Sequence, residues 1–114
     1  MKQTQLLKGI LEGCVLLIIS EKEVYGYELV QLLKKYGFKQ MVAGTVYPLL
    51  QKLEKQNYLS SVMKPSSEGP DRKYYKLTLE GNEYCREFID QWKNITSNVD
   101  NLISLKGEKF YEQK

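Results

Sequence analysis

Apolar positions recur with a helical period in four separate segments of the chain. Residues 4–20 are apolar on nearly every side, which is typical of a helix that other elements cover. Residues 25–36 are amphipathic and are followed by Gly37, a residue that commonly ends a helix. Residues 45–58 and 79–105 repeat the pattern, and Thr78 is the expected N-cap of the last segment. The pattern predicts three short helices and one long C-terminal helix.

The third helix has one apolar face and one polar face. Thr45 is its expected N-cap, which puts Pro48 in the first turn, where the missing N–H has no intrahelical partner to lose. The inward face holds Val46, Leu49, Leu50 and Leu53. The opposite face holds Tyr47, Gln51, Lys52 and Lys55. A face with two cations and no carboxylate suits contact with a polyanion, and an ordinary solvated helix face is the alternative.

Two alternating stretches between the third and last helices predict a β-hairpin. They are LSSVMK at residues 59–64 and RKYYKLT at 72–78, joined by a turn at 65–71. The alternation puts Arg72, Tyr74 and Lys76 on one side of the second strand and Lys73, Tyr75 and Leu77 on the other. We expect the cations and phenols that follow the flexible turn to meet phosphates. The alternative is a hairpin whose outer face happens to be basic.

The last helix has the most regular apolar period in the chain. Its heptad seam alternates in steps of three and four through Cys85, Phe88, Trp92, Ile95, Val99 and Leu102. A helix of ~27 residues, at about 1.5 Å each, is roughly 40 Å long. It therefore extends beyond the core that the preceding residues can form. We therefore expect a second copy to cover Ile95, Val99 and Leu102. Packing within one chain is the alternative, and it explains only the start of the seam.

Charge is concentrated in the middle of a chain that is the size of one domain. The 114 residues are 42% apolar and 27% charged, with a net charge of +3, ordinary values for a globular protein. Residues 34–76 hold nine cations and three anions, a net charge of +6, whereas residues 1–33 sum to −1 and residues 77–114 to −2. The third helix and the hairpin are therefore where a polyanion is expected to bind.

Catalytic, metal and membrane signals are weak. The chain has no histidine, and Cys14 and Cys85 are too far apart for a metal motif, so we expect no enzyme activity, no metal and no cofactor. Two separated cysteines also fit a reducing cytoplasm. The apolar run at residues 14–19 is far shorter than the ~20 residues that span a bilayer, so we expect no membrane partner.

The order of elements predicts a winged helix-turn-helix, a mostly α fold with a small β-hairpin wing and a long C-terminal dimerisation helix. In that arrangement the third helix enters the major groove and a hairpin with a cationic tip reaches the neighbouring backbone. The expected domains are a DNA-binding domain at 1–78, a dimerisation helix at 79–105 and a polar tail at 106–114. A winged-helix protein–protein interaction module without DNA binding is the alternative.

Three stretches, taken together, resemble the PadR-like family of transcriptional regulators, in its small subgroup with one C-terminal helix. They are YGYELVQLLK, GTVYPLLQKLEKQNYL and GPDRKYYKLTLEG, although Asp71 stands where the family pattern often has a cation. The resemblance implies a cytoplasmic homodimeric repressor on an inverted-repeat, double-stranded DNA operator. It also places Thr45 and Tyr47 on the DNA, and Arg72 and Lys73 on the wing.

The two arguments together define three candidate sets of residues. The DNA-binding set is Thr45, Tyr47, Gln51, Lys52, Lys55, Arg72 and Lys73. The dimer set joins the first and last helices through Leu11, Cys14, Trp92, Ile95, Val99 and Leu102. The effector set is Trp92 with Phe88, because a bulky knob in a two-helix seam leaves an aromatic-walled cavity for a small aromatic or cationic ligand. A tryptophan that only fills the core is the alternative.

Overall fold

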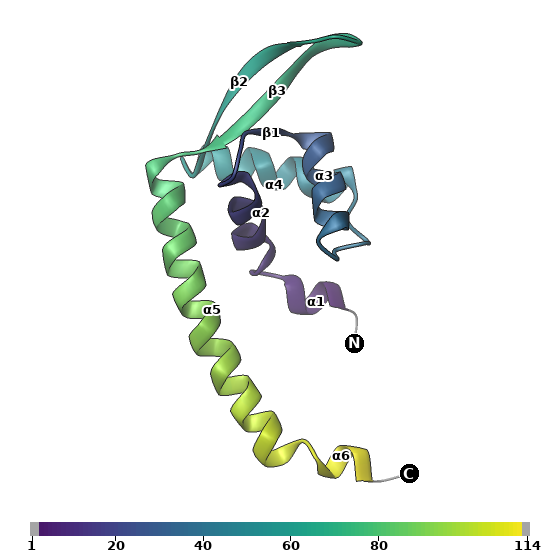
Figure 1. Ribbon diagram of the computed structural model, residues 1–114, viewed down its shortest axis with the longest axis vertical. Coiled ribbons are helices and arrows are strands. Elements are labelled where there is room, and N and C mark those ends of the chain that lie inside the picture. The colour runs from purple at the N-terminus through teal and green to yellow at the C-terminus, as the bar shows by residue number, and fades with distance from the viewer. Residues whose placement is uncertain (1–2, 113–114) are drawn as a thin grey trace.

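The computed structural model describes residues 3–112 as a winged helix-turn-helix body from which one long helix projects (Figure 1). The helices are α1 (Gln3–Leu7), α2 (Leu11–Ile19), α3 (Gly26–Lys35), α4 (Ala43–Lys55), α5 (Leu79–Lys106) and α6 (Lys109–Glu112). The strands are β1 (Val24–Tyr25), β2 (Leu59–Ser66) and β3 (Gly69–Leu77), in an antiparallel sheet of order β1-β3-β2. The predicted fold class is confirmed.

The core lies where α2, α3 and α4 meet the sheet. Its members are the residues that the apolar periods placed inward, and the largest fully buried ones are Leu16, Ile19, Leu29, Leu33, Leu50, Leu53 and Leu59. Each buried leucine contributes about 1.5–3 kcal/mol of transfer free energy relative to an exposed one. This packing holds α4 against the body, so that only the opposite face of α4 is exposed.

The first predicted helix is broken into two. Gly9 has a φ of +89°, a left-handed conformation that glycine adopts without steric cost, and it separates α1 from α2. The expectation of one helix over residues 4–20 was therefore wrong. Gly13 of α2 allows a close approach to α5, because a side chain at this position would overlap the ring of Phe88.

The helix α4 begins earlier than its sequence indicates. Its N-cap is Val42, in an extended conformation, and not Thr45, which lies inside the first turn. Pro48 is therefore an interior residue of α4, and its missing N–H removes one hydrogen bond from the helix. Burial of Val46 and Leu50 on the core side offsets the loss of this hydrogen bond, because both side chains are almost completely inaccessible.

The wing, defined as β2 and β3, is longer than predicted and pairs with a third strand. The strands run to Ser66 and from Gly69, so only two residues form the turn where seven were expected. The other edge of β3 pairs with β1, in the register Val24↔Tyr75. A strand of two residues has no alternating pattern to detect, which is why the sequence did not reveal it.

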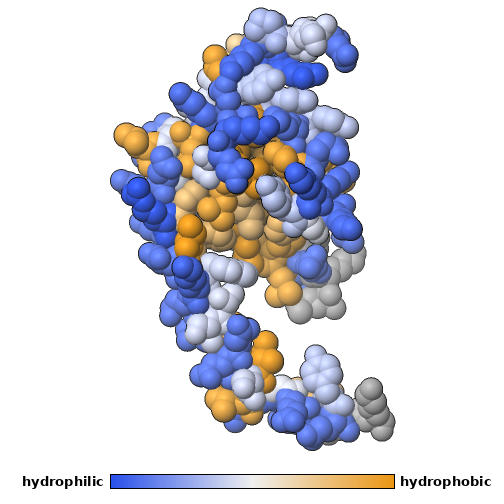
Figure 2. All heavy atoms as spheres, viewed as in Figure 1, coloured by the Kyte–Doolittle hydropathy of each residue, from blue (hydrophilic) through white to orange (hydrophobic). Residues whose placement is uncertain are grey.

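The long helix α5 leaves its own domain after a few turns. The hydroxyl oxygen of Thr78 accepts a hydrogen bond from the backbone N–H of Gly81 at 2.9 Å, which confirms the predicted N-cap. Buried residues occur only in its first two turns, at Gly81 and Cys85. Hydrophobic side chains lie exposed near its far end (Figure 2). In the described chain, no helix is both long and apolar enough to cross a lipid bilayer.

The expected polar tail is not uniformly polar. Within residues 106–114, α6 carries Phe110 and Tyr111, both largely exposed, while residues 113–114 lie outside the described part of the chain.

Candidate nucleic-acid interface

The outward face of α4 carries the residues that the helical period placed there. Packing of the opposite stripe into the core fixes the rotation of α4, so the outward positions are accessible. Thr45, Tyr47, Gln51, Lys52 and Lys55 are all exposed. The face therefore offers a hydroxyl, a phenol, an amide and two ammonium groups to a partner.

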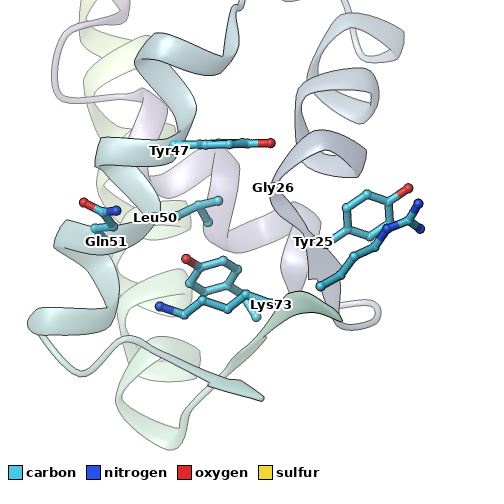
Figure 3. A pocket seen from close by; sticks show the side chains of 8 residues that line it. Tyr25, Gly26, Tyr47, Leu50, Gln51 and Lys73 are labelled. Carbon is cyan, nitrogen blue, oxygen red and sulfur yellow. The ribbon is translucent and has the colours of Figure 1, made fainter. Parts of the chain in front are cut away.

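A notch separates this face from the base of the wing (Figure 3). It has a volume of about 300 Å³ and is lined by Tyr47 on α4 and by Tyr75 on β3, among others. Its lining residues are Tyr25, Gly26, Tyr47, Leu50, Gln51, Arg72, Lys73 and Tyr75. The structure thus brings four predicted DNA-binding residues together. Thr45 stands apart, in a separate groove with Met41 and Leu49.

Glu54 connects α4 to both strands of the wing. Its carboxylate pairs with the ammonium group of Lys73 at 2.8 Å and accepts a hydrogen bond from the hydroxyl of Ser61. The hydrogen bonds from Lys73 and Ser61 lower the pKa of Glu54, and the same bond to Glu54 raises the pKa of Lys73. The outer face of this helix was predicted to carry no carboxylate. In the fold Glu54 is part of the surface, so a phosphate must compete with it for Lys73.

Internal ion pairs also occupy other cations near this surface. Lys52 pairs with Glu12 of α2 at 2.7 Å, and Lys64 of β2 pairs with Glu23. Among residues 3–112, Lys55 and Arg72 have no carboxylate within 4.0 Å. Of the four cations predicted to meet DNA, Lys55 and Arg72 are therefore the two that need not break an ion pair first.

The two tyrosines of the wing make different contacts, Tyr75 with the core and Tyr74 with the strand β1. Tyr75 is 6% exposed and belongs to the core. Tyr74 meets Tyr25 edge to face at 5.4 Å, and the guanidinium of Arg72 lies 4.5 Å from the centre of the Tyr25 ring. The alternation of Arg72 and Tyr74 on one side of β3 is as predicted. Burial of Tyr75 contradicts the expectation that its ring meets a phosphate, whereas Tyr74 is only partly buried. Both tyrosines hold the base of the wing to the body.

The cations of the wing lie within the paired residues 59–64 and 72–77, the half of the hairpin nearer the body, and not at its tip. Arg72 pairs in register with Lys64, and the residues beyond that pair, 65–71, contain no cation and two anions, Glu68 and Asp71. The expected cationic tip was therefore wrong. An acidic tip is repelled by phosphates, so the part of the wing suited to DNA is the part beside α4.

Three residues of this surface were not singled out from the sequence: Tyr25 and Gly26, which line the notch, and Glu54, which pairs with Lys73. The stretch YGYEL indicated only a helix start, and Glu54 was visible as the single carboxylate among the residues of α4. Neither feature of the sequence shows which residues lie nearby, because β3 brings Lys73 to Glu54, and Tyr75 to the notch with Tyr25 and Gly26, only in the tertiary fold.

The heptad seam is largely uncovered in the single chain. Trp92 is 43% exposed and stacks on Phe88, with ring centroids 6.4 Å apart, while Ile95, Val99 and Leu102 are each about half exposed or more. Leu11 and Cys14, also predicted at a dimer interface, are partly buried within their own domain. The exposed end of the seam is apolar on successive turns, which is unusual for a helix that faces only water.

Comparisons with known proteins agree with this arrangement. The model of the transcriptional regulator PadR-like family matches residues 15–87. A Streptococcus transcriptional regulator of known structure is 54% identical, with a TM-score of 0.78 over 86% of this chain and 96% of that one. A PadR-like transcriptional regulator from Bacillus cereus is 47% identical, with a TM-score of 0.79 over 87% and 96%.

An uncharacterised protein of Lysinibacillus sphaericus is 30% identical over 102 residues, which span 88% of this chain and 94% of the relative. The family match covers well over half of the chain and includes α3, α4 and the wing. On this evidence, the chain belongs to the PadR-like family of transcriptional regulators.

Proposed function

We propose that the chain is a repressor that binds, as a homodimer, to an inverted-repeat operator in double-stranded DNA. The observation that carries this proposal is the single surface formed by the outward face of α4 and the base of the wing. Tyr47, Gln51, Arg72 and Lys73 line one notch there, and Lys55 lies exposed on the same helix. Amide and phenol groups suit base edges, and the cations suit the phosphates that flank a groove.

The homodimer is supported by the uncovered seam of α5. Val99 is 47% exposed and Leu102 60% exposed, although a seam of this period packs well against a second helix of the same kind. A two-fold axis along α5 would place two copies of α4 on the same side of the assembly. Two helices that read successive major grooves lie about 34 Å apart, and the two-fold relation between them makes the half-sites an inverted repeat.

The proposal is tested by selecting DNA from a random-sequence pool with the purified protein. We expect the recovered sequences to share two inverted half-sites about one helical turn apart, and the DNA upstream of its own gene to shift in a gel. A reporter placed behind the recovered site should rise in expression when the protein is absent. Recovery of no common sequence, with binding that does not distinguish duplexes, would favour the interaction-module alternative.

We further propose that a small aromatic or cationic effector releases the protein from DNA. Support comes from Trp92, which is partly exposed and stacks on Phe88 at an interplanar angle of 22°. Two such pairs facing each other across a dimer axis would make an aromatic-walled site suited to flat or cationic ligands. A bound ligand changes operator affinity only through its different affinities for the two states of the dimer.

Titration with planar aromatic dyes and drugs is expected to quench the fluorescence of Trp92, the single tryptophan, in a saturable way. Quenching should weaken operator binding over the same concentration range, because both report one site. Phe88→Leu, which keeps an apolar residue but removes the stacked ring, should reduce the affinity of the dye while leaving the dimer intact. Quenching that leaves operator affinity unchanged would instead assign Trp92 to packing alone.

A further inference from the structure

Gly26, the first residue of α3, occupies a position where the backbone does not require glycine. Among the described residues, only Gly9 and Gly37 are glycines with a positive φ. Alanine is also the better helix former, by about 1 kcal/mol in a helix interior. The reason for glycine at this position must therefore lie outside the local backbone.

The neighbour of Gly26 is the ring of Tyr47. A Cβ atom built on Gly26 would lie 3.0 Å from both Cδ1 and Cζ of that ring. It would lie closer still to Cε1, at a separation that real Cβ atoms essentially never show. Figure 3 shows the ring reaching from α4 toward α3 across Gly26, where it closes one side of the notch. The missing side chain is what leaves room for the ring.

A methyl group at this position would displace the ring and would not unfold the domain. Tyr47 is 44% exposed, and the atoms in the way belong to the end of a side chain with two rotatable bonds, so the ring can swing outward. Gly81 differs in this respect, because a Cβ there would meet the backbone carbonyl of Tyr58, which cannot move independently. Gly26 is thus placed to control where the Tyr47 phenol lies.

We propose that Gly26 is a positioning residue for DNA recognition. Its missing side chain lets the Tyr47 ring lie across the N-terminus of α3, at the notch between α4 and the wing. This inference rests on the proposed DNA-binding function. It assigns to the glycine of the YGYEL stretch a role in binding that its place at a helix start does not imply. Arg72 and Lys73 line the same notch, so the ring position also sets how closely α4 and the base of the wing approach a bound duplex.

A double-mutant cycle on Gly26 and Tyr47 tests the proposal. Binding of wild type, Gly26→Ala, Tyr47→Ala and the double variant is measured by fluorescence anisotropy on a labelled duplex that the wild type selected from a random pool. We expect each single variant to bind about tenfold more weakly. The double variant should be no weaker than Tyr47→Ala, because no ring remains for the methyl group to displace.

Thermal melting of the four proteins separates positioning from folding. Gly26→Ala should melt close to wild type, whereas a merely structural role predicts loss of affinity in parallel with loss of folded protein. If Gly26→Ala does not fold, the double variant should, since the overlap is with the ring alone. A double variant that stays unfolded overturns the proposal.

Three binding results would also overturn it: full affinity in Gly26→Ala, full affinity in Tyr47→Ala, or losses that add in the double variant. Failure of the proposed function looks different, because the wild-type protein would then select no duplex at all.

Discussion

Val99→Asp is expected to convert the proposed homodimer into folded monomers and to abolish tight operator binding. The substitution places a carboxylate in an apolar seam, where an unpaired charge costs several kcal/mol. A two-fold interface contains the substituted residue twice, so the cost is incurred by both chains. Each monomer would then hold one half-site only, and we expect operator affinity to fall by at least about 100-fold.

The measurement is sedimentation at micromolar concentration, followed by anisotropy on the selected duplex. Val99 lies beyond the buried part of α5, so the circular dichroism melt of the domain should change little. Ser97→Asp is the matched control, because Ser97 is exposed two positions away on the same helix, off the heptad seam, and gains the same charge. A Val99→Asp chain that still sediments as a dimer, or a wild-type monomer, contradicts the predicted interface.

The double variant Arg72→Ala/Lys73→Ala is expected to show the second-largest effect, a much shallower dependence of operator affinity on salt. Each lost phosphate contact reduces the slope of log affinity against log salt by ~0.9. Two contacts on each wing give a reduction of about 1.8 per chain and about 3.6 per dimer. The affinity itself should fall on the order of 100- to 1,000-fold near 0.15 M salt, where this electrostatic contribution is still large.

Arg86→Ala/Lys93→Ala is the matched control for the salt slope. It removes the same formal charge from exposed positions of α5, away from the wing, and should leave the slope nearly unchanged. Arg72→Ala alone should account for about half of the reduction. A double variant on the wing with the wild-type slope would show that the base of the wing does not contact phosphates.

Glu54→Gln changes the same surface but is expected to raise the affinity for the operator. The substitution removes a negative charge and frees Lys73 from its partner at 2.8 Å, so operator affinity is expected to rise a few-fold. A fall in affinity would mean that Glu54 matters more for orienting Lys73 than for competing with the phosphate. Either result separates the contribution of Lys73 from that of Arg72, whose guanidinium lies over Tyr25.

The spacing of apolar residues within each segment was sufficient to predict most of the helices and the faces that they bury. Val46, Leu50 and Leu53 follow one face of α4, and all three are buried. Thr78 caps α5, and Gly37, with a φ of +106°, ends α3. These features depend on interactions within one or two helical turns, so the local sequence is sufficient to predict them.

Details of the elements were predicted less well where tertiary packing overrode a local preference. Pro48 and Thr45 indicated a start for α4 that is too late, because the helix begins at Ala43 and burial of Val46 and Leu50 on the core side keeps Pro48 inside it. Strand β1 is two residues long and exists only because β3 has a free edge beside it. The Gly9 break was read as helix because the apolar residues on both sides continue the same period.

The sequence by itself determined the fold class, the polar outer face of α4, the basic middle third and the exposed heptad seam. Only the tertiary structure decided which of those basic groups are already paired. Lys52 meets Glu12 across 40 residues of chain, Lys73 meets Glu54 of α4, and the ring of Tyr47 meets Gly26 of another helix. Periodicity specifies which way a side chain points from its own element, whereas a partner on a distant element is fixed only when the buried faces dock.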